Sequence, residues 1–349
     1  MSQGCRAQPD FLPGWRRIIE PQVDVHNHRT LRRNVLALLT DSGGFGGALG
    51  FIGYTTVLPS LVVLLTNSEP LVGLIGTLWM GAWLLPQLPA GRWLGGRAHK
   101  KPALLGSAAA ARVMILIPAI ALTLNLDRWL TFWLLLVAVI VFRGADAVSA
   151  VAWFDIVSKV LPPRIRGRVM GWLQANSFVI QFGASLVVMW ALSDAAPGFP
   201  HNYALLLFMA AALLLMSFGA LTFLVEPPGA LSDGAAARLN LGAHARHVLK
   251  SSRAFRQLSL ARIAVGSIGL AIPFYSVQAI KVLGLPENLL GVFQAAQTVG
   301  NAASAPTSKV NFQHLSHFTP PARSMVAARP SASRRFTSTC EVMNSPGRS

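Results

Sequence analysis

An uncharged apolar run, 71–91, ends abruptly in a cluster of positive charge, and few folds can accommodate such a segment. No residue in the run has an ionisable side chain. As a helix rising ~1.5 Å per residue, it is long enough to cross the ~30 Å hydrocarbon core of a bilayer. The charges that follow are Arg92, Arg97, Lys100 and Lys101. Lysine and arginine clusters beside a span are retained in the cytoplasm, so this run is predicted to be a membrane span that ends there.

Similar apolar runs recur along the chain, separated by loops that alternate in charge. The predicted spans are 35–65, 71–91, 102–124, 130–157, 169–192, 203–225, 258–280 and 288–305. The loops after every second span are basic, and 26 of the 30 lysine and arginine residues lie in segments that are thereby placed in the cytoplasm. The sequence therefore predicts an all-α integral membrane protein of the cell (plasma or inner) membrane, with eight spans and both termini in the cytoplasm.

The composition agrees with this class. Hydrophobic residues make up 53% of the chain and charged residues only 12%, about half the charged fraction of a soluble domain. The net charge of +17 is spread between the apolar runs instead of along one helix face, which argues against nucleic-acid binding. Cys5 and Cys340 lie in segments predicted to be cytoplasmic, so no structural disulfide is expected.

Five segments are predicted from these patterns. They are a cytoplasmic lead (1–33), a six-helix half (34–225), a basic cytoplasmic linker (226–257), a partial second half (258–305) and a disordered tail (306–349). The lead is polar and has no apolar core of its own, so the first span is expected to act as the insertion signal.

A short internal repeat relates the two halves. Residues 69–73 (EPLVG) open the second span, and residues 287–291 (ENLLG) open the eighth. Both segments follow loops predicted to be external. Two halves in the same orientation, joined by a long basic linker after the sixth span, are typical of transporters built from repeated six-helix units.

Three local motifs point to a family. The loop after the second span, 91–101 (GRWLGGRAHKK), is basic and contains glycine; the fourth span contains 143–146 (RGAD); and a basic turn, 162–168 (PPRIRGR), leads into the fifth. In these motifs, residues 34–305 resemble the major facilitator superfamily (MFS) of secondary transporters. The resemblance implies an MFS-like fold with a complete N-terminal six-helix half and about two helices of the second half.

The chain also departs from the pattern of that family. The acidic residue of the first loop motif is absent, because Gly95 and Gly96 occupy its place. The Gly-Pro-rich motif of the drug–proton exchangers is absent from the fifth span, which disfavours multidrug efflux. No counterpart of spans 9–12 follows Ala305. We therefore expect a truncated or frameshifted gene, which translation of the other two frames of the coding DNA would test.

Charged residues within the spans are the first site candidates, because a charge at the bilayer centre costs ~2.5–3.5 kcal/mol on insertion scales. Arg143 and Asp146 are three residues apart on one helix and face one side of it. They either bind a charged substrate or proton together, or form an ion pair that fixes the span. Asp41 is either a protonation site or an interfacial residue at the cytoplasmic end of its span. Arg112 is either buried or extends along a helix groove.

Polar residues in the later spans are further candidates. Gln174 and Gln181 share one face of the fifth span and either line the central cavity or hydrogen-bond to other spans. Tyr275 and Gln278 are the candidates on the seventh span. By the family resemblance, Asp155 at the exit of the fourth span pairs with a loop base such as Arg97. That pair is either a gating latch or a simple helix-end charge.

A glycine-rich run, 42–50 (SGGFGGALG), has the composition of a dinucleotide-binding loop. No strand precedes it and its glycine spacing does not fit that motif. We interpret the small residues as a surface that allows neighbouring helices to approach closely.

The expected function is secondary active transport of a small solute by alternating access, with or without proton coupling. The alternative is that this chain is a non-transporting remnant of such a transporter. The expected partners are the lipid bilayer and a small-molecule substrate, without nucleic acid. No enzyme activity, cofactor or metal is expected, because the spans lack histidine, cysteine and acid-rich metal motifs. The histidine pairs at 26 and 28 and at 244 and 247 lack a third ligand.

Overall fold

The computed structural model describes residues 28–228, 246 and 249–316, and these contain helices and no strand. The chain divides into two units, Met1–Ala302 and Ala303–Ser349. The last helix, Leu289–Ser316, contains this boundary. Within the second unit, the structure describes residues 303–316 only. The predictions for 1–27, most of the linker and 317–349 lie outside the described residues, including those for both cysteines, His26, His244 and His247.

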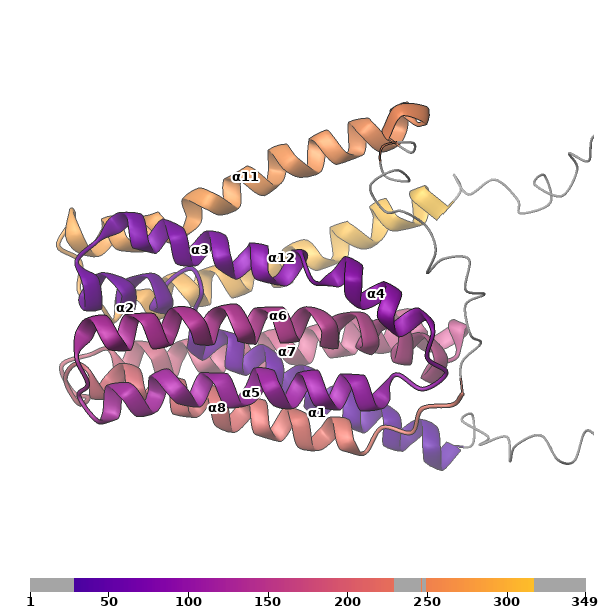
Figure 1. Ribbon diagram of the computed structural model, residues 1–349, viewed down its shortest axis with the longest axis horizontal. Coiled ribbons are helices and arrows are strands. Elements are labelled where there is room, and N and C mark those ends of the chain that lie inside the picture. The colour runs from indigo at the N-terminus through magenta and orange to yellow at the C-terminus, as the bar shows by residue number, and fades with distance from the viewer. Residues whose placement is uncertain (1–27, 229–245, 247–248, 317–349) are drawn as a thin grey trace, which may run out of the picture. The chain divides into compact units, whose positions relative to one another are not determined.

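The helices from α1 to α8 follow one another with short connections (Figure 1). They are α1 (His28–Ile52), α2 (Val57–Thr66), α3 (Glu69–Leu84), α4 (Gln87–Gly95), α5 (Lys101–Thr123), α6 (Arg128–Val160), α7 (Pro163–Ala191), α8 (His201–Thr222), α11 (Arg253–Lys281) and α12 (Leu289–Ser316).

Six helical segments of the described chain are long and apolar enough to cross a membrane. They are α1 with α2, α3 with α4, α5, α6, α7 and α8. The prediction of an all-α membrane protein is thus confirmed. Helices α11 and α12 occupy the places of the seventh and eighth predicted spans, and that they cross the membrane stays a prediction.

Two spans that the sequence analysis treats as continuous are broken. The run 35–65 is interrupted at Gly53, whose φ of 48° lies in the left-handed region and which starts the turn into α2. The run 71–91 is interrupted at residues 85–86. Pro86 has no backbone N–H to continue the helical hydrogen bonds, so the chain turns there between α3 and α4.

The helix ends also differ from the predicted segment boundaries. Helix α1 begins at His28, so the last residues of the predicted lead 1–33 form its first turns. Helix α11 begins at Arg253, inside the predicted linker 226–257. Helix α12 continues to Ser316, beyond the predicted start of the tail at residue 306.

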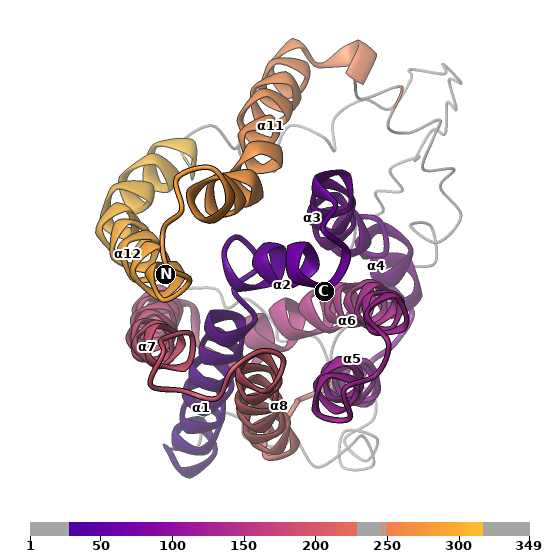
Figure 2. The same cartoon turned by 90° about the vertical axis from the view of Figure 1, so that its left-hand side faces the viewer.

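Helix α1 lies between α7 and α8 (Figure 2). Its glycines allow this approach. A Cβ atom on Gly44 would lie 2.7 Å from the carbonyl oxygen of Leu213 on α8, and one on Gly50 would lie 2.9 Å from the Cβ of Ala184 on α7. The run 42–50 is therefore a helix-packing surface, as interpreted from the sequence.

At one end of the bundle, acidic side chains hold the basic loops together. Glu226, which follows α8, accepts hydrogen bonds from the backbone N–H groups of Lys100 (2.8 Å) and Lys101 (2.7 Å) and from Lys159 Nζ (3.1 Å). A carboxylate at the start of α5 also complements the helix dipole. Glu226 thus places a negative charge beside the loop 91–101, which has Gly95 and Gly96 where the resembling family has an acidic residue.

The first and last helices of the six-span half are joined at this same end. The Asn34 side chain of α1 exchanges two hydrogen bonds with the backbone of Val225: Val225 N donates to its Oδ1 (2.9 Å), and its Nδ2 donates to the Val225 carbonyl (3.3 Å). Arg33 Nε donates to the carbonyl of Phe223 at 2.8 Å. The end of α8 is thereby fixed to the start of α1.

At the opposite end, α11 and α12 contact the first half through neutral polar groups. Thr56 Oγ1 donates to Gln294 Oε1 (3.1 Å), Thr55 Oγ1 donates to Gln297 Oε1 (2.9 Å), and Ser276 Oγ donates to the Thr55 carbonyl (3.0 Å). We call these five residues the polar seam. It lies where α1 breaks at Gly53, so the break supplies the groups that meet the second half.

The two repeated acids also connect the halves at this end. Glu69 of α3 lies 3.9 Å from Lys281 Nζ of α11. Glu287, at the equivalent place in the repeat, accepts a hydrogen bond from the Tyr203 hydroxyl of α8 at 3.0 Å. Each copy of the repeat therefore contributes one acid that contacts the other half.

Candidate functional site

Four charged side chains are buried inside the bundle. Asp41 on α1, Arg112 on α5, and Arg143 and Asp146 on α6 are each less than a tenth exposed, between 4% and 8%. Buried charges within spans are costly and need partners to be tolerated. The structure brings the four into one region, where two carboxylates and two guanidinium groups balance.

Asp41 accepts hydrogen bonds from two other helices and lies near a guanidinium group on a third. Its Oδ1 accepts from Ser217 Oγ at 2.6 Å and lies 3.9 Å from Arg112 Nη2, and its Oδ2 accepts from Trp153 Nε1 at 2.9 Å. Asp41 is the fourteenth residue of α1, roughly 20 Å along the helix axis. Asp41 is thus buried among the helices of the bundle, and its role as a protonation site stays a prediction.

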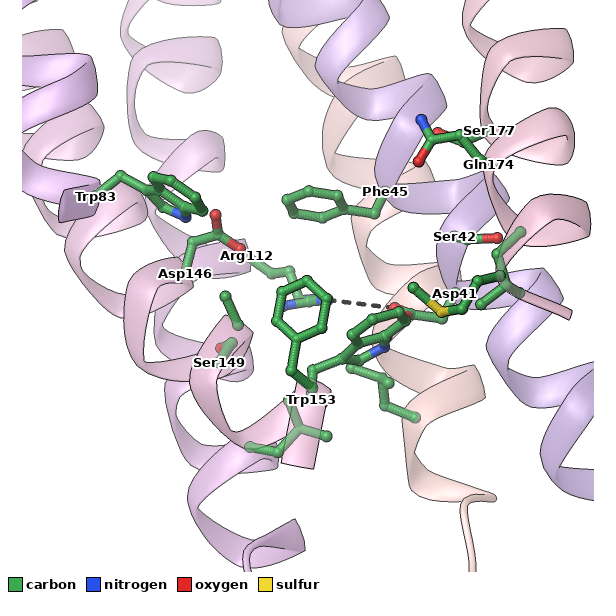
Figure 3. Close-up of a pocket in the computed structure, with 16 residues that line it drawn as sticks. Asp41, Ser42, Phe45, Trp83, Arg112, Asp146, Ser149, Trp153, Gln174 and Ser177 are labelled. Carbon is green, nitrogen blue, oxygen red and sulfur yellow. Dashed lines mark hydrogen bonds and ion pairs between the residues drawn. The ribbon is translucent and has the colours of Figure 1, made fainter. Parts of the chain in front are cut away.

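Arg112 is satisfied by main-chain and side-chain oxygens. Its Nε donates to the Leu214 carbonyl (3.1 Å), its Nη1 to the Ala108 carbonyl (3.1 Å) and its Nη2 to Ser217 Oγ (2.9 Å). In Figure 3 its guanidinium group lies between the carboxylates of Asp41 and Asp146. Arg112 thus connects the two acids without forming a close ion pair with either.

Arg143 pairs with Asp146 within α6, with Nη1 and Oδ2 2.9 Å apart. Its Nε donates to the carbonyl of Trp79 on α3 at 3.1 Å. Its guanidinium also lies over the rings of Trp79 (4.6 Å) and Trp83 (5.3 Å), a favourable cation–π arrangement. Arg143 therefore both neutralises Asp146 and ties α6 to α3.

These groups border a cavity of about 310 Å³ inside the six-helix half. Residues from α1, α3, α5, α6, α7 and α8 line it (Figure 3). They are Asp41, Ser42, Phe45, Trp83, Leu104, Arg112, Asp146, Ser149, Ala150, Trp153, Phe154, Met170, Leu173, Gln174, Ser177 and Leu221. The size is at the lower end of the range for small-molecule sites.

Three of the predicted site residues, Asp41, Asp146 and Gln174, line this cavity. Arg143 lies behind Asp146 and is not among the lining residues. Gln181 lies farther along α7, where its side chain packs against Gly50 of α1. Gln174 and Gln181 share one face of α7, but Gln174 lines the cavity and Gln181 packs against α1.

The candidates on the seventh predicted span lie elsewhere. Tyr275 is 65% exposed. It lines a separate pocket of about 230 Å³, together with Thr55, Thr56 and Gln297 of the polar seam. Gln278 is exposed on α11 and lies outside both sets of lining residues. The main cavity therefore does not include either residue.

Asp155 pairs with a base of the loop after α4, as expected, but this base is Lys100 and not Arg97. Asp155 forms ion pairs with Lys100 Nζ and Lys159 Nζ, each at 2.7 Å. Arg97 instead lies over the ring of Trp93, with its guanidinium carbon 3.8 Å from the ring centroid. The acid does contact the loop after α4, but through a lysine three positions farther along.

The sequence does not assign a functional role to Arg112 or Trp153. The signal for Arg112 is present, since it is the only charge in its span. The sequence alone does not tell whether such an arginine turns inward or extends to the interface. Nothing in the sequence separates Trp153 from the other tryptophans of the spans. Within the described ranges, no group of histidine, cysteine and acidic residues is arranged to hold a metal ion.

Neither a protein-family model nor a curated protein matches this chain. Solved structures do. One is the crystal structure of a bacterial homologue of the human lysosomal transporter Spinster, inward-facing and unoccupied. It is 17% identical with a TM-score of 0.60, and the match covers 83% of this chain and 63% of that one. The chain has the major facilitator fold.

A D-xylose–proton symporter is a weaker match, 16% identical with a TM-score of 0.46, covering 80% of this chain and 69% of that one. Both matched structures are described as transporters. This chain spans less than two thirds of the length of the Spinster homologue. With the major facilitator fold assigned, the prediction of a multi-pass membrane protein in contact with the lipid bilayer is confirmed.

Proposed function

We propose that this chain carries out secondary active transport of a small solute by alternating access. The observation that carries the proposal is the cavity of about 310 Å³ with Asp41, Arg112 and Asp146 in its wall, inside membrane-crossing helices of a major facilitator fold. Buried charges that serve packing alone need no cavity beside them. We further propose that Asp41 takes up and releases the coupled proton, because protonation would weaken its hydrogen bonds to α6 and α8 and its attraction to Arg112 on α5.

The orientation forms part of the proposal. The basic loops after α4 and α6 meet at one end of the bundle through Glu226 and Asp155, and we place that end in the cytoplasm of a plasma or inner membrane. In this orientation the polar seam closes the cavity toward the outside. Solute enters the cavity from whichever side is open while the other stays closed.

Cysteine labelling tests alternating access without knowledge of the solute. In a chain with Cys5→Ser and Cys340→Ser, an Ala150→Cys variant places one thiol in the cavity wall. A membrane-impermeant maleimide added outside intact cells should label it slowly. A disulfide between Thr55→Cys and Gln297→Cys across the polar seam should stop that labelling, and a reductant should restore it.

Two results would count against the proposal. Labelling from outside that the seam disulfide does not change would mean that the cavity is permanently open. No labelling from outside with or without the disulfide, and labelling from the cytoplasmic side only, would favour the alternative of a non-transporting remnant.

A further inference from the structure

The charges around the cavity already satisfy one another. Asp41 accepts from Ser217 and Trp153, and Asp146 pairs with Arg143. Arg112 directs three of its five N–H donors to protein oxygens. A charged solute would have to break one of these arrangements or remain unpaired, and both are costly in an apolar site.

The remaining wall is largely aromatic and aliphatic. Phe45, Trp83, Trp153 and Phe154 contribute rings from α1, α3 and α6, and aliphatic side chains from α5, α7 and α8 complete the surface. Aromatic walls favour flat rings through stacked or edge-to-face contacts. Such a wall offers few partners to a sugar, whose many hydroxyl groups would lose hydrogen bonds to water without replacement.

Two uncharged side chains in the wall have no hydrogen-bond partner among the described residues. Of the serines, Ser42 donates to the Leu39 carbonyl, and Ser149 is bonded to Ser107 and the Ala145 carbonyl. The side chains of Gln174 and Ser177 form no hydrogen bond among the described residues. They are three positions apart on α7 and lie together on one side of the cavity, away from Trp83 (Figure 3).

From this arrangement, and resting on the proposed transport function, we infer that the solute is uncharged and contains a flat ring with one hydrogen-bonding group. The ring lies among Phe45, Trp83 and Trp153. The polar group contacts Gln174 and Ser177 on α7. The four buried charges then position the helices and move the proton, and they do not bind the solute directly.

A naphthalene series tests this inference with one ring and different substituents. Binding of 2-naphthol, 2-naphthoate, 2-naphthylmethylammonium and naphthalene to the purified 349-residue chain is measured by titration calorimetry in lipid nanodiscs. We expect 2-naphthol to bind most tightly and each charged probe to bind about tenfold or more weakly. Naphthalene should bind several-fold more weakly than 2-naphthol, because it leaves Gln174 and Ser177 without a partner.

Variants separate the site from partition into lipid. Gln174→Leu should remove the preference for 2-naphthol over naphthalene, whereas Gln257→Leu, an exposed glutamine on α11, should leave it unchanged. Ala150→Trp fills the cavity and should abolish saturable binding of every probe. Binding that persists in Ala150→Trp would place the probes outside the cavity and overturn the inference.

The outcomes also distinguish this inference from the proposed function. Tighter binding of either charged probe, or equal binding of naphthol and naphthalene, would overturn the solute class. If no probe binds while Ala150→Cys still shows seam-dependent labelling, the solute class is wrong and the transport proposal stands. If the labelling fails as well, both are wrong.

Discussion

Arg143 has two roles that a single substitution removes together, since it pairs with Asp146 and bonds to α3. Arg143→Ala should abolish transport and leave membrane insertion intact. Leaving a buried acid unpaired costs about 3–5 kcal/mol, so the variant should also unfold at lower temperature in detergent. Transport that is unchanged in Arg143→Ala would contradict its assignment to the site, and Arg168→Ala, an exposed arginine of α7, is the control.

Asp41 should make alternating access depend on pH. The neutral amide of Asp41→Asn imitates the protonated acid, so this variant should label differently from the parent at high pH and like it at low pH. The readout at each pH is the rate at which Ala150→Cys is labelled from outside divided by the rate from the cytoplasmic side. The pH dependence of the thiol's own reactivity cancels in this ratio. A ratio that does not change with pH would exclude Asp41 as the proton carrier.

At the scale of single residues, the sequence predicted the buried acids better than it predicted their partners. Asp41 and Asp146 were found because an acid within a span is expensive and therefore informative. Gln181 and Gln278 do not line the cavity that Asp41 and Asp146 border, because helix periodicity shows which residues share a face, but not which neighbour covers that face. The partners of Asp41 come from α5, α6 and α8, a combination that only the packing reveals.

At the scale of the helix, the glycines of α1 set how closely it packs. A Cβ on Gly46 would overlap the Ser177 side chain of α7, whereas one on Gly183 of α7 meets nothing within 4 Å. Gly46→Ala should therefore destabilise the bundle by about 1–3 kcal/mol, and Gly183→Ala should not. Thermal unfolding in the same detergent compares the two, and equal stability would contradict the close packing of α1 against α7.

The polar seam should control which side of the transporter is open. Gln294 is 4% exposed and accepts from Thr56, so Gln294→Ala weakens contact between α12 and the turn that precedes α2. We expect faster labelling of Ala150→Cys from outside than in the parent, because the closed state loses stability. The matched control is Gln257→Ala on the exposed surface of α11. Slower labelling in Gln294→Ala would reverse the role given to the seam.

The breaks in the first two predicted spans differ in how well the sequence predicts them. Pro86 predicts an interruption of 71–91, because proline has no backbone N–H to donate. Gly53 is one of many glycines near the end of the first span, and the turn there depends on its positive φ. The helix ends also differ from the predicted span boundaries, because capping and packing extend helices beyond the apolar runs. At the start of α6, for example, Asp127 accepts hydrogen bonds from the N–H groups of Trp129 and Leu130.

For the molecule as a whole, the proposed orientation predicts where labels enter. Thiols at Arg97→Cys and Arg164→Cys should react only from the cytoplasmic side, and one at Arg128→Cys only from outside. The parent for all three lacks Cys5 and Cys340. Intact cells and inside-out vesicles supply the two sides, and reaction of Arg97→Cys and Arg164→Cys from opposite sides would reject the eight-span topology.

The fold could be predicted because charge alternation between apolar runs records topology directly. The seventh and eighth spans remain predictions, since six segments of the described chain meet the requirements of length and hydropathy. The solute could not be predicted in this way. It depends on which side chains of α1, α3, α6 and α7 face one cavity, and such contacts join residues far apart in the chain.

The packing of α1 also has a consequence for synthesis. Its neighbours α7 and α8 are the last of the six spans to leave the ribosome, and the donors to Asp41 arrive separately, Arg112 with α5, Trp153 with α6 and Ser217 with α8. Helix α1 is therefore inserted before the partners of its Asp41 carboxyl group are synthesised. Its packing is complete only after α8 is inserted, so slow insertion of α8 prolongs the time for which α1 is unpacked.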